Sequence, residues 1–260
     1  MELYSNDNQF HEVWPPIQHV APDSLKNKIL FKLRLFFDLQ VFTIYCDIKR
    51  ELKYIKNDVL EIGCGLQPYR HLILREAKYY ALEKKGHSSF FPYNPNTIEY
   101  GGGTFPFKDK VFNLVFHTEV LEHVYDFTQF LSECHRVLAE KGRMFFTIPF
   151  AVRYHYIPND YWRLTPASIE KLLKKANFKN IIVKNRGSDI VVAFSKLNAL
   201  FYRIIFRGYN SFLLRIINQV FFGILFIIPI MCLTFSSHLL ILLKIGSPDD
   251  PLGYTVYCEK

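Results

Sequence analysis

The stretch "DVLEIGCGLQP", residues 58–68, restricts the fold more than any other part of the chain. Its apolar run is typical of a buried β-strand, and Gly63, Cys64 and Gly65 follow the run directly. Glycines at the end of a strand allow a tight turn and let a ligand approach the backbone closely. A dinucleotide-binding turn would need a third glycine at position 68, where the chain has Pro68. This turn therefore disfavours a nicotinamide or flavin cofactor.

Further short apolar runs alternate with helical patterns along the chain. One amphipathic helix is predicted over residues 120–142, with Gly142 at its end. Strands and helices in alternation predict a parallel sheet with helices on both faces, and such sheets bind ligands beyond the carboxyl ends of their strands. The predicted strands are residues 58–63, 79–83, 112–117, 143–149 and 181–185.

An acid stands at the end of the second predicted strand. Glu83 follows Gly63 by 20 residues, and this spacing suits a carboxylate that accepts hydrogen bonds from two ribose hydroxyls. A bound nucleoside would explain both the glycines and the acid. The alternative is an ordinary strand-to-helix turn followed by a surface acid.

The N-terminal part of the chain predicts one long amphipathic helix over residues 25–55. Residues 1–16 are polar and acidic, so we expect no secretory signal there. Five scattered cysteines without CxxC spacing argue against a disulfide framework or a zinc site and favour a reducing compartment.

Four segments in this order resemble the class I S-adenosylmethionine-dependent methyltransferases of the small-molecule type, the type 11-like group. The segments are "LEIGCG", "YALE", "FPFKDKVFNLVFHTEVLEHVYD" and "HRVLAEKGRMFFTIP". The resemblance implies a doubly wound, mostly parallel, seven-stranded α/β sheet of the Rossmann-like methyltransferase kind, with S-adenosylmethionine as cofactor. It also implies cofactor contacts from Glu61, Gly63, Cys64, Gly65, Glu83, Phe107 and His117.

A methyltransferase that acts on a hydroxyl needs a base near the methyl group, and histidine is the usual choice. In "TEVLEHV" a helix would place Glu119, Glu122 and His123 on one face. This E-x-x-E-H segment is similar to one that binds a divalent metal in ubiquinone-biosynthesis O-methyltransferases. The alternative is that Glu122 and His123 only brace the loop, and we assign no metal ligand.

The segment "HYIPNDYWRLTP", residues 155–166, predicts a substrate lid over the cofactor pocket. It resembles a pattern in methyltransferases linked to glycan or envelope biosynthesis. His155, with Asp160, is the second candidate for proton transfer. The alternative is that Asp160 and Arg163 form a local salt bridge while Trp162 packs into the core.

The region from Val191 to Pro248 has no acid, and its residues 216–243 contain no lysine or arginine either. These 28 residues are long enough to cross a hydrocarbon core of about 30 Å as one helix. However, "YTVYCEK" at residues 254–260 is predicted as a strand. The resemblance implies that this last strand inserts antiparallel between the fifth and sixth strands, so the chain has to return. We therefore predict a re-entrant or interfacial hairpin, kinked at Pro229 with a polar apex at residues 234–238. A buried helical subdomain or a dimer interface is the alternative.

These features divide the chain into an N-terminal segment (1–57), a methyltransferase core (58–190), an apolar insertion (191–248) and the final strand (249–260). The chain has a net charge of +8, but the basic residues of the first predicted helix have no aromatic stacking platform beside them. Nucleic acid is therefore not an expected partner. We predict O-methylation of a small or lipid-linked molecule on the cytoplasmic side of a membrane. The rivals are a soluble small-metabolite methyltransferase with an apolar dimer interface and a non-catalytic nucleoside-binding membrane module. The sequence leaves the oligomeric state open.

Overall fold

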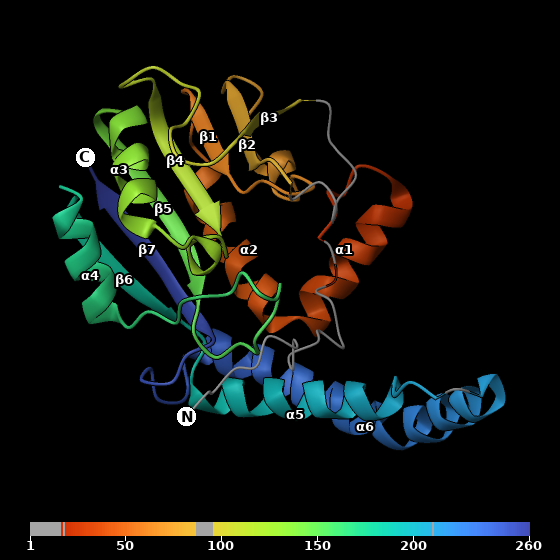
Figure 1. The fold of residues 1–260 in the computed structure, drawn as a ribbon. Coiled ribbons are helices and arrows are strands. Elements are labelled where there is room, and N and C mark those ends of the chain that lie inside the picture. Colours follow the sequence, from red (N-terminus) through yellow and green to blue (C-terminus); the bar gives the residue numbers. More distant parts are fainter. Residues whose placement is uncertain (1–16, 18, 87–95, 210) are drawn as a thin grey trace, which may run out of the picture.

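The computed structural model describes residues 17, 19–86, 96–209 and 211–260, so the N-terminal stretch examined for a secretory signal lies outside it. Seven strands form one sheet in the order β3-β2-β1-β4-β5-β7-β6 (Figure 1). All neighbouring strands are parallel except β7, which runs antiparallel to both β5 and β6. The strands are β1 (Val59–Ile62), β2 (Tyr79–Lys84), β3 (Thr97–Tyr100), β4 (Phe112–Thr118), β5 (Leu138–Pro149), β6 (Lys179–Arg186) and β7 (Gly253–Glu259).

Helices cover both faces of the sheet, as the alternation of strands and helices predicts. Successive residues of a strand point to opposite faces, and in β1 Val59 packs with helix α2 (Leu39–Leu52) while Leu60 packs with the opposite core. That opposite core includes Phe130 of α3 (Phe127–Val137) and Ile169 of α4 (Pro166–Lys175). The doubly wound fold class is therefore confirmed, and the final strand pairs where we expected it.

The single helix expected over residues 25–55 is wrong. The structure has α1 (Leu25–Phe37) and α2 instead, separated at Asp38. Asp38 has an extended backbone, and its carboxylate accepts a hydrogen bond from the Val41 N–H at 3.2 Å. An aspartate in this role starts a new helix, because it satisfies an amide that has no partner inside the helix.

The helix expected over residues 120–142 is also too long. A short 3₁₀ turn, η3 (Leu121–His123), comes first, and α3 then begins after its cap Asp126. At Leu138 the chain is already extended and pairs with Phe112 of β4. Gly142 therefore lies inside β5 rather than at a helix end. A Cβ at this position would lie 2.7 Å from the Ala139 carbonyl oxygen.

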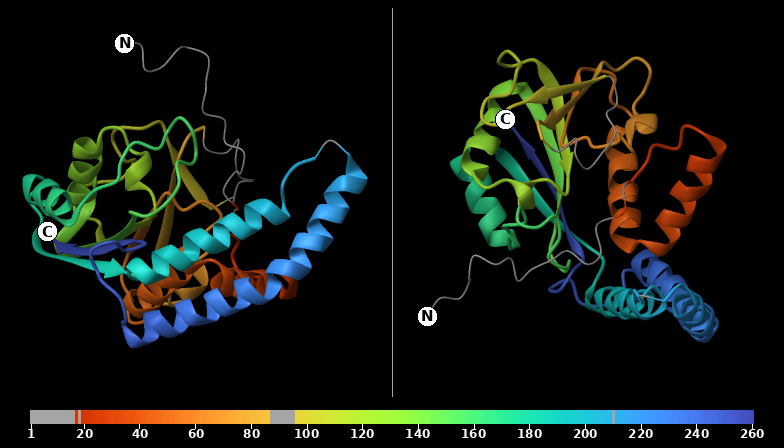
Figure 2. Two further views of the ribbon diagram at one scale, coloured as in Figure 1. Left: turned by 90° about the horizontal axis from the view of Figure 1, so that it is seen from below. Right: turned by 45° about the vertical axis from the view of Figure 1, so that its right-hand side comes forward.

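The apolar insertion forms a hairpin of two helices, α5 (Asp189–Ile205) and α6 (Phe212–Leu243) (Figure 2). The expected apex at residues 234–238 is wrong, because α6 continues through Pro229 and the turn lies between α5 and α6. Thr234 and Ser237 are fully buried. Thr234 accepts a hydrogen bond from Asn198 of α5 at 3.0 Å, so the polar residues serve helix packing.

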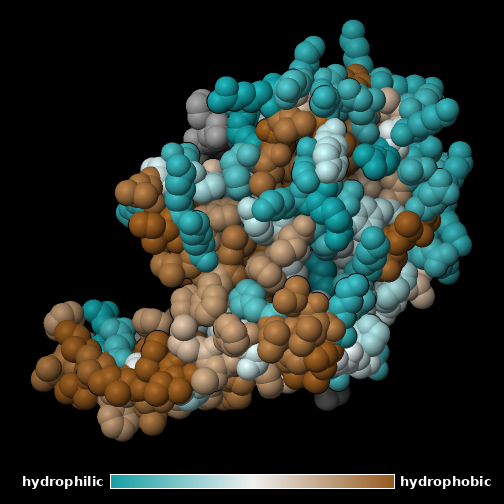
Figure 3. Space-filling view, turned by 180° about the vertical axis from the view of Figure 1, so that it is seen from behind, coloured by the Kyte–Doolittle hydropathy of each residue, from teal (hydrophilic) through white to brown (hydrophobic). Residues whose placement is uncertain are grey.

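Much of the hairpin surface is apolar and exposed. Figure 3 shows this surface as a brown arm that projects from the more polar body. Helix α6 is long and apolar enough to cross a membrane, and only 11% of its most apolar 18-residue window is buried. A core helix of a soluble protein would be mostly buried, and this helix is mostly exposed.

Candidate active site

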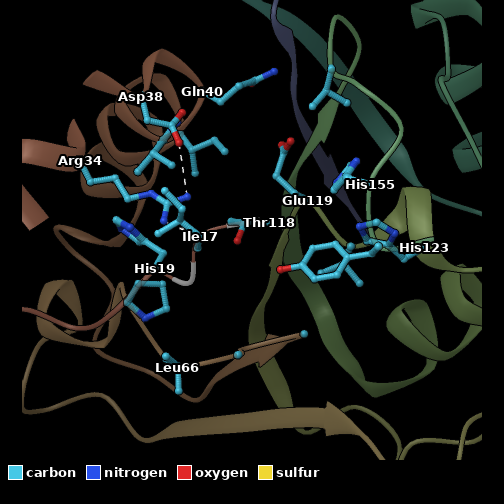
Figure 4. A pocket seen from close by; sticks show the side chains of 18 of the residues that line it. Ile17, His19, Arg34, Asp38, Gln40, Leu66, Thr118, Glu119, His123 and His155 are labelled. Atoms are coloured by element: carbon cyan, nitrogen blue, oxygen red, sulfur yellow. Dashed lines mark hydrogen bonds and ion pairs between the residues drawn. The ribbon is translucent and has the colours of Figure 1, made fainter. Parts of the chain in front are cut away.

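One cavity of about 630 Å³ lies at the carboxyl ends of β1, β2 and β4. Figure 4 shows side chains from both halves of the chain around it. Its wall includes the turn after β1, the segments after β4 and β5, and residues of the helices α1, α2 and α5. Glu83 of β2 and Ile17 and His19 before α1 also line it. The cavity thus connects the glycine turn with the apolar hairpin.

The two glycines after β1, Gly63 and Gly65, differ in what a side chain at each position would meet. Both have positive φ, +65° at Gly63 and +48° at Gly65, which favours glycine. A Cβ at Gly63 would lie 2.4 Å from the Cγ2 atom of Val120, so packing within the protein excludes a side chain there. A Cβ at Gly65 would meet no described atom within 4 Å. Only Gly65 therefore leaves open space at the cavity wall for a ligand.

Two acids and a cysteine predicted to contact the cofactor line the same cavity. Glu83 accepts a hydrogen bond from the Gly65 N–H at 2.9 Å, which fixes the acid beside the turn. Glu61 is 1% exposed and accepts a hydrogen bond from the Tyr79 hydroxyl. Burial raises the pKa of Glu61 to about 8, although the Tyr79 bond opposes this. Burial likewise raises the pKa of the Cys64 thiol, so the thiol stays protonated.

Two other residues in the predicted cofactor set lie away from the cavity wall. Phe107 packs edge-on against Phe112 at a ring separation of 4.9 Å. His117 is fully buried and stacks on Phe146 at 4.7 Å, and neither of its ring nitrogens has a hydrogen-bond partner among the described residues. Burial lowers the pKa of His117 to about 3. The structure thus places His117 inside the packed core and Phe107 against it, and neither residue lines the cavity.

Both histidines predicted to transfer protons line the cavity and face each other, with ring centroids 4.9 Å apart (Figure 4). The Nδ1 atom of His123 lies 2.6 Å from the Asn159 carbonyl oxygen. In His155 the Nδ1 atom lies 3.0 Å from the Asp160 carboxylate. Since both neighbours are acceptors, each ring in its neutral form would carry its proton on Nδ1 and leave its Nε2 atom as the acceptor.

Asp160 itself does not line the cavity. Its side chain is fully buried and accepts two hydrogen bonds from Arg163, at 2.6 and 2.7 Å. Burial alone would raise the pKa of Asp160, but the bonds from His155 and Arg163 outweigh it and hold the pKa below its usual range. Trp162 packs against Phe127 in the core. The local salt bridge of Asp160 with Arg163 and the packing of Trp162, which were the alternative to a role in catalysis, are thus observed. His155 still lines the cavity.

The three residues of the E-x-x-E-H segment do not share one helical face. Glu119 has a φ of +52° and precedes η3, and its carboxylate pairs with Arg186 at 2.8 Å. Glu122 is fully buried, and neither carboxylate oxygen has a hydrogen-bond partner among the described residues. Burial and the nearby Glu119 raise the pKa of Glu122 well above its usual value. The expected common face is therefore wrong, because the chain turns at Glu119.

His155 instead joins the other two residues of that segment. One potential ligand atom from each of Glu122, His123 and His155 lies within 4.8 Å of the others. These three residues could hold a metal ion, and the sequence assignment of no metal ligand stays a prediction.

The sequence did not reveal the wall that α1, α2 and α5 contribute. Arg34 and Asp38 form an ion pair at 3.3 Å on this wall, and Gln40 lies beside them. Behind Gln40, the buried Arg186 donates to its side chain at 3.1 Å and also to Glu119. Polar residues at the joint between two helices were the only signal in the sequence, and the predicted continuous helix concealed it.

Comparison with known proteins identifies a methyltransferase domain in this chain. Residues 60–146 match the family model of a methyltransferase domain. The structure is similar to that of a SAM-dependent methyltransferase from Archaeoglobus fulgidus, with a TM-score of 0.52 and 15% identity, over 90% of this chain and 99% of that one. It also matches a SAM-dependent methyltransferase from Thermotoga maritima, a possible histamine N-methyltransferase, at a TM-score of 0.48 and 12% identity, over 90% and 97% of the two chains. A search of curated protein sequences finds no match.

The matched residues run from β1 into β5 and include the glycine turn, Glu83 and His123. The shared fold extends over nearly the whole chain. The chain therefore contains a methyltransferase domain over residues 60–146, on a fold that it shares with a SAM-dependent methyltransferase.

Proposed function

We propose that this methyltransferase transfers a methyl group to a hydroxyl of a membrane-associated or lipid-linked small molecule, at the cytoplasmic face of a membrane. The observation that carries the proposal is the continuity of the cavity. One cavity is lined by Gly65 and Glu83, by His123 and His155, and by Lys196 and Arg203 of α5. An acceptor held at the hairpin would therefore reach the cofactor through one space.

The apolar hairpin supports attachment to a membrane. Its exposed surface includes Phe221, Ile224 and Ile228, which are 61%, 72% and 71% exposed. Burying such side chains in an apolar phase is favourable by about 1.5–3 kcal/mol each. Because β7 follows the hairpin and rejoins the sheet, the chain enters and leaves the apolar region on the same side.

The residues of this chain would divide the work between binding and proton transfer. Glu83 would hold the ribose hydroxyls, and the open space at Gly65 would admit the cofactor. S-adenosylmethionine, when bound, supplies a methyl group on a positively charged sulfur. Alignment of the acceptor with that methyl group can contribute about 7–11 kcal/mol. The Nε2 atom of His155 would take the hydroxyl proton, while Asp160 orients the ring.

The cofactor assignment is tested with Gly65→Leu and Glu83→Ala. A leucine at position 65 would fill the open space and strain a left-handed backbone, so we expect loss of S-adenosylmethionine binding in calorimetry. Loss of the Glu83 carboxylate should weaken binding by about 1.5–3 kcal/mol. Glu99→Ala, at an acid on the neighbouring edge strand that does not line the cavity, is the control. Unchanged affinity in both test variants would contradict the assignment.

The proton transfer is tested with His123→Ala and His155→Ala. A variant that loses the base should keep its cofactor affinity and lose roughly 10²–10⁴-fold in turnover. Turnover is measured as radiolabelled methyl incorporation into membrane lipid extracts, with and without a chelator. Preserved turnover in both variants would exclude either histidine as the base. A loss of turnover on addition of the chelator would indicate a metal requirement, for which Glu122, His123 and His155 are the candidate ligands.

A further inference from the structure

Helix α5 presents one set of residues to the active-site cavity and another to helix α6. Ser195, Lys196, Ala199 and Arg203 line the cavity, at spacings that share one helical face. Asn198 faces α6 and donates a hydrogen bond to Thr234. The helix is therefore both a wall of the active-site cavity and half of the apolar hairpin.

The acids of the cavity wall already have partners within the protein. Asp38 pairs with Arg34, and Glu119 pairs with Arg186. Glu61 accepts from Tyr79, and Glu83 accepts from the Gly65 N–H. These partners lie in the described part of the chain, and none of them is Lys196 or Arg203.

The two cations of α5 differ from these acids. In the described part of the chain, neither Lys196 nor Arg203 forms a salt bridge or hydrogen bond. Burial lowers the pKa of Lys196, and the neighbouring Arg203 lowers it further, while Asp250 opposes the effect. Two cations at the wall of a cavity, neither in an ion pair with an acid of the described chain, favour an anionic ligand.

The surroundings of these cations indicate which anion would approach. On the same helix, Leu197 is 39% exposed and Leu200 is 50% exposed. The adjoining α6 exposes a long apolar surface, seen as the brown arm in Figure 3. A ligand that carries both a phosphate and an alkyl chain matches this combination of charge and apolar surface, because the phosphate can meet the cations while the chain stays against the hairpin.

We propose that Lys196 and Arg203 form a phosphate subsite for the headgroup of a lipid acceptor that enters the cavity along α5. This inference rests on the proposed function, since it names the acceptor class as a phosphate-bearing lipid. Arg guanidinium groups bind phosphate oxygens in a fork, and lysine supplies a point charge. The phosphate would anchor the acceptor at one end of the cavity and leave its hydroxyl to reach His155.

The test uses the full chain in uncharged detergent micelles, with dodecyl phosphate as the probe and calorimetry as the readout. We expect Lys196→Gln/Arg203→Gln to weaken binding about tenfold or more, since charged hydrogen bonds are lost. Arg207→Gln is the matched control, because Arg207 follows the same helix, packs over Tyr209 and does not line the cavity. Dodecanol and inorganic phosphate are the ligand controls.

Three outcomes would overturn the subsite. The first is a double variant that binds dodecyl phosphate as tightly as the wild type does. The second is an Arg207→Gln variant that weakens binding as much as the double variant does. The third is inorganic phosphate that binds as tightly as dodecyl phosphate. The last outcome would indicate a site for soluble phosphate. Affinity for S-adenosylmethionine, measured on the same samples, should be unchanged in all variants. Because the binding assay needs no turnover, failure to methylate lipid extracts would reject the proposed function separately.

Discussion

Glu61 is an acid in the middle of a buried strand, and it lines the cavity where the cofactor would bind. Burial raises its pKa to about 8, so at pH 7 most molecules carry a protonated Glu61 when the cavity is empty of cofactor. S-adenosylmethionine carries two positive groups, an ammonium and a sulfonium. A positive charge beside a carboxyl lowers the pKa of that carboxyl.

We therefore predict that cofactor binding releases roughly one proton at pH 7. The affinity should rise with pH towards 8 and then level off, because the bound state favours the ionised acid. Calorimetry in buffers with different ionisation enthalpies measures the release. Glu61→Gln should abolish it. A binding enthalpy that does not depend on the buffer in the wild type would place Glu61 away from the positive groups of the cofactor.

At the scale of elements, the sequence predicted which segments are strands better than where the helices end. The β1 run is apolar and bounded by a glycine turn, so its type and limits follow from local chemistry. Edge strand β3 is only four residues long and was missed. Helix ends depended on single residues, since Asp38 can continue a helical pattern or cap a new helix, and only the Arg34 and Val41 contacts decide between them.

In the candidate site, too, some residues could be placed from local sequence and others depend on long-range packing. Gly65 and Glu83 could be placed from their positions relative to strands. The meeting of His123 and His155 could be expected only in outline, because a loop of irregular structure brings His155 back to η3. The roles of Arg34, Lys196 and Arg203 as cavity residues depend on long-range packing of helices that no local pattern encodes.

The α5–α6 hairpin supplies the prediction at this scale. Asn218 of α6 donates to the Ile204 and Ile205 carbonyl oxygens at 2.9 and 2.8 Å, and these carbonyls belong to the last turn of α5. Asn218→Leu should leave them without this partner, at a cost of about 1–3 kcal/mol, and open the turn between the helices. Trypsin in detergent micelles should then cut faster at Arg207. Gln219→Leu, at the next and partly buried residue, is the control, and equal cleavage of both variants would contradict this role.

For the whole molecule, the two ends of the hairpin are joined where it meets the catalytic body. The Ser247 N–H donates to the Asp189 carboxylate at 2.8 Å, and the Ser188 hydroxyl donates to the Ile245 carbonyl oxygen at 2.9 Å. The hairpin thus leaves and re-enters the body at one narrow junction. Removing residues 193–244 and closing the gap with a short Gly/Ser linker should keep both contacts.

We expect that shortened protein to stay in the supernatant and to bind S-adenosylmethionine, because β6 and β7 remain neighbours in the sheet. The full chain should sediment with membranes, and tags at both termini should be accessible only from the cytoplasmic side. A full chain that stays soluble without detergent would reject membrane attachment. A C-terminal tag on the far side would contradict the position of β7 in the sheet.

The place of β7 in the chain also bears on how the enzyme is made. During synthesis β5 and β6 emerge first, but they are not neighbours in the finished sheet, because β7 lies between them. The ribosome delivers the whole apolar hairpin before it delivers β7. The slot in the sheet therefore stays open until the hairpin has left the ribosome. Nascent chains halted before residue 253 should remain sensitive to protease, because completion of the catalytic domain waits for the hairpin.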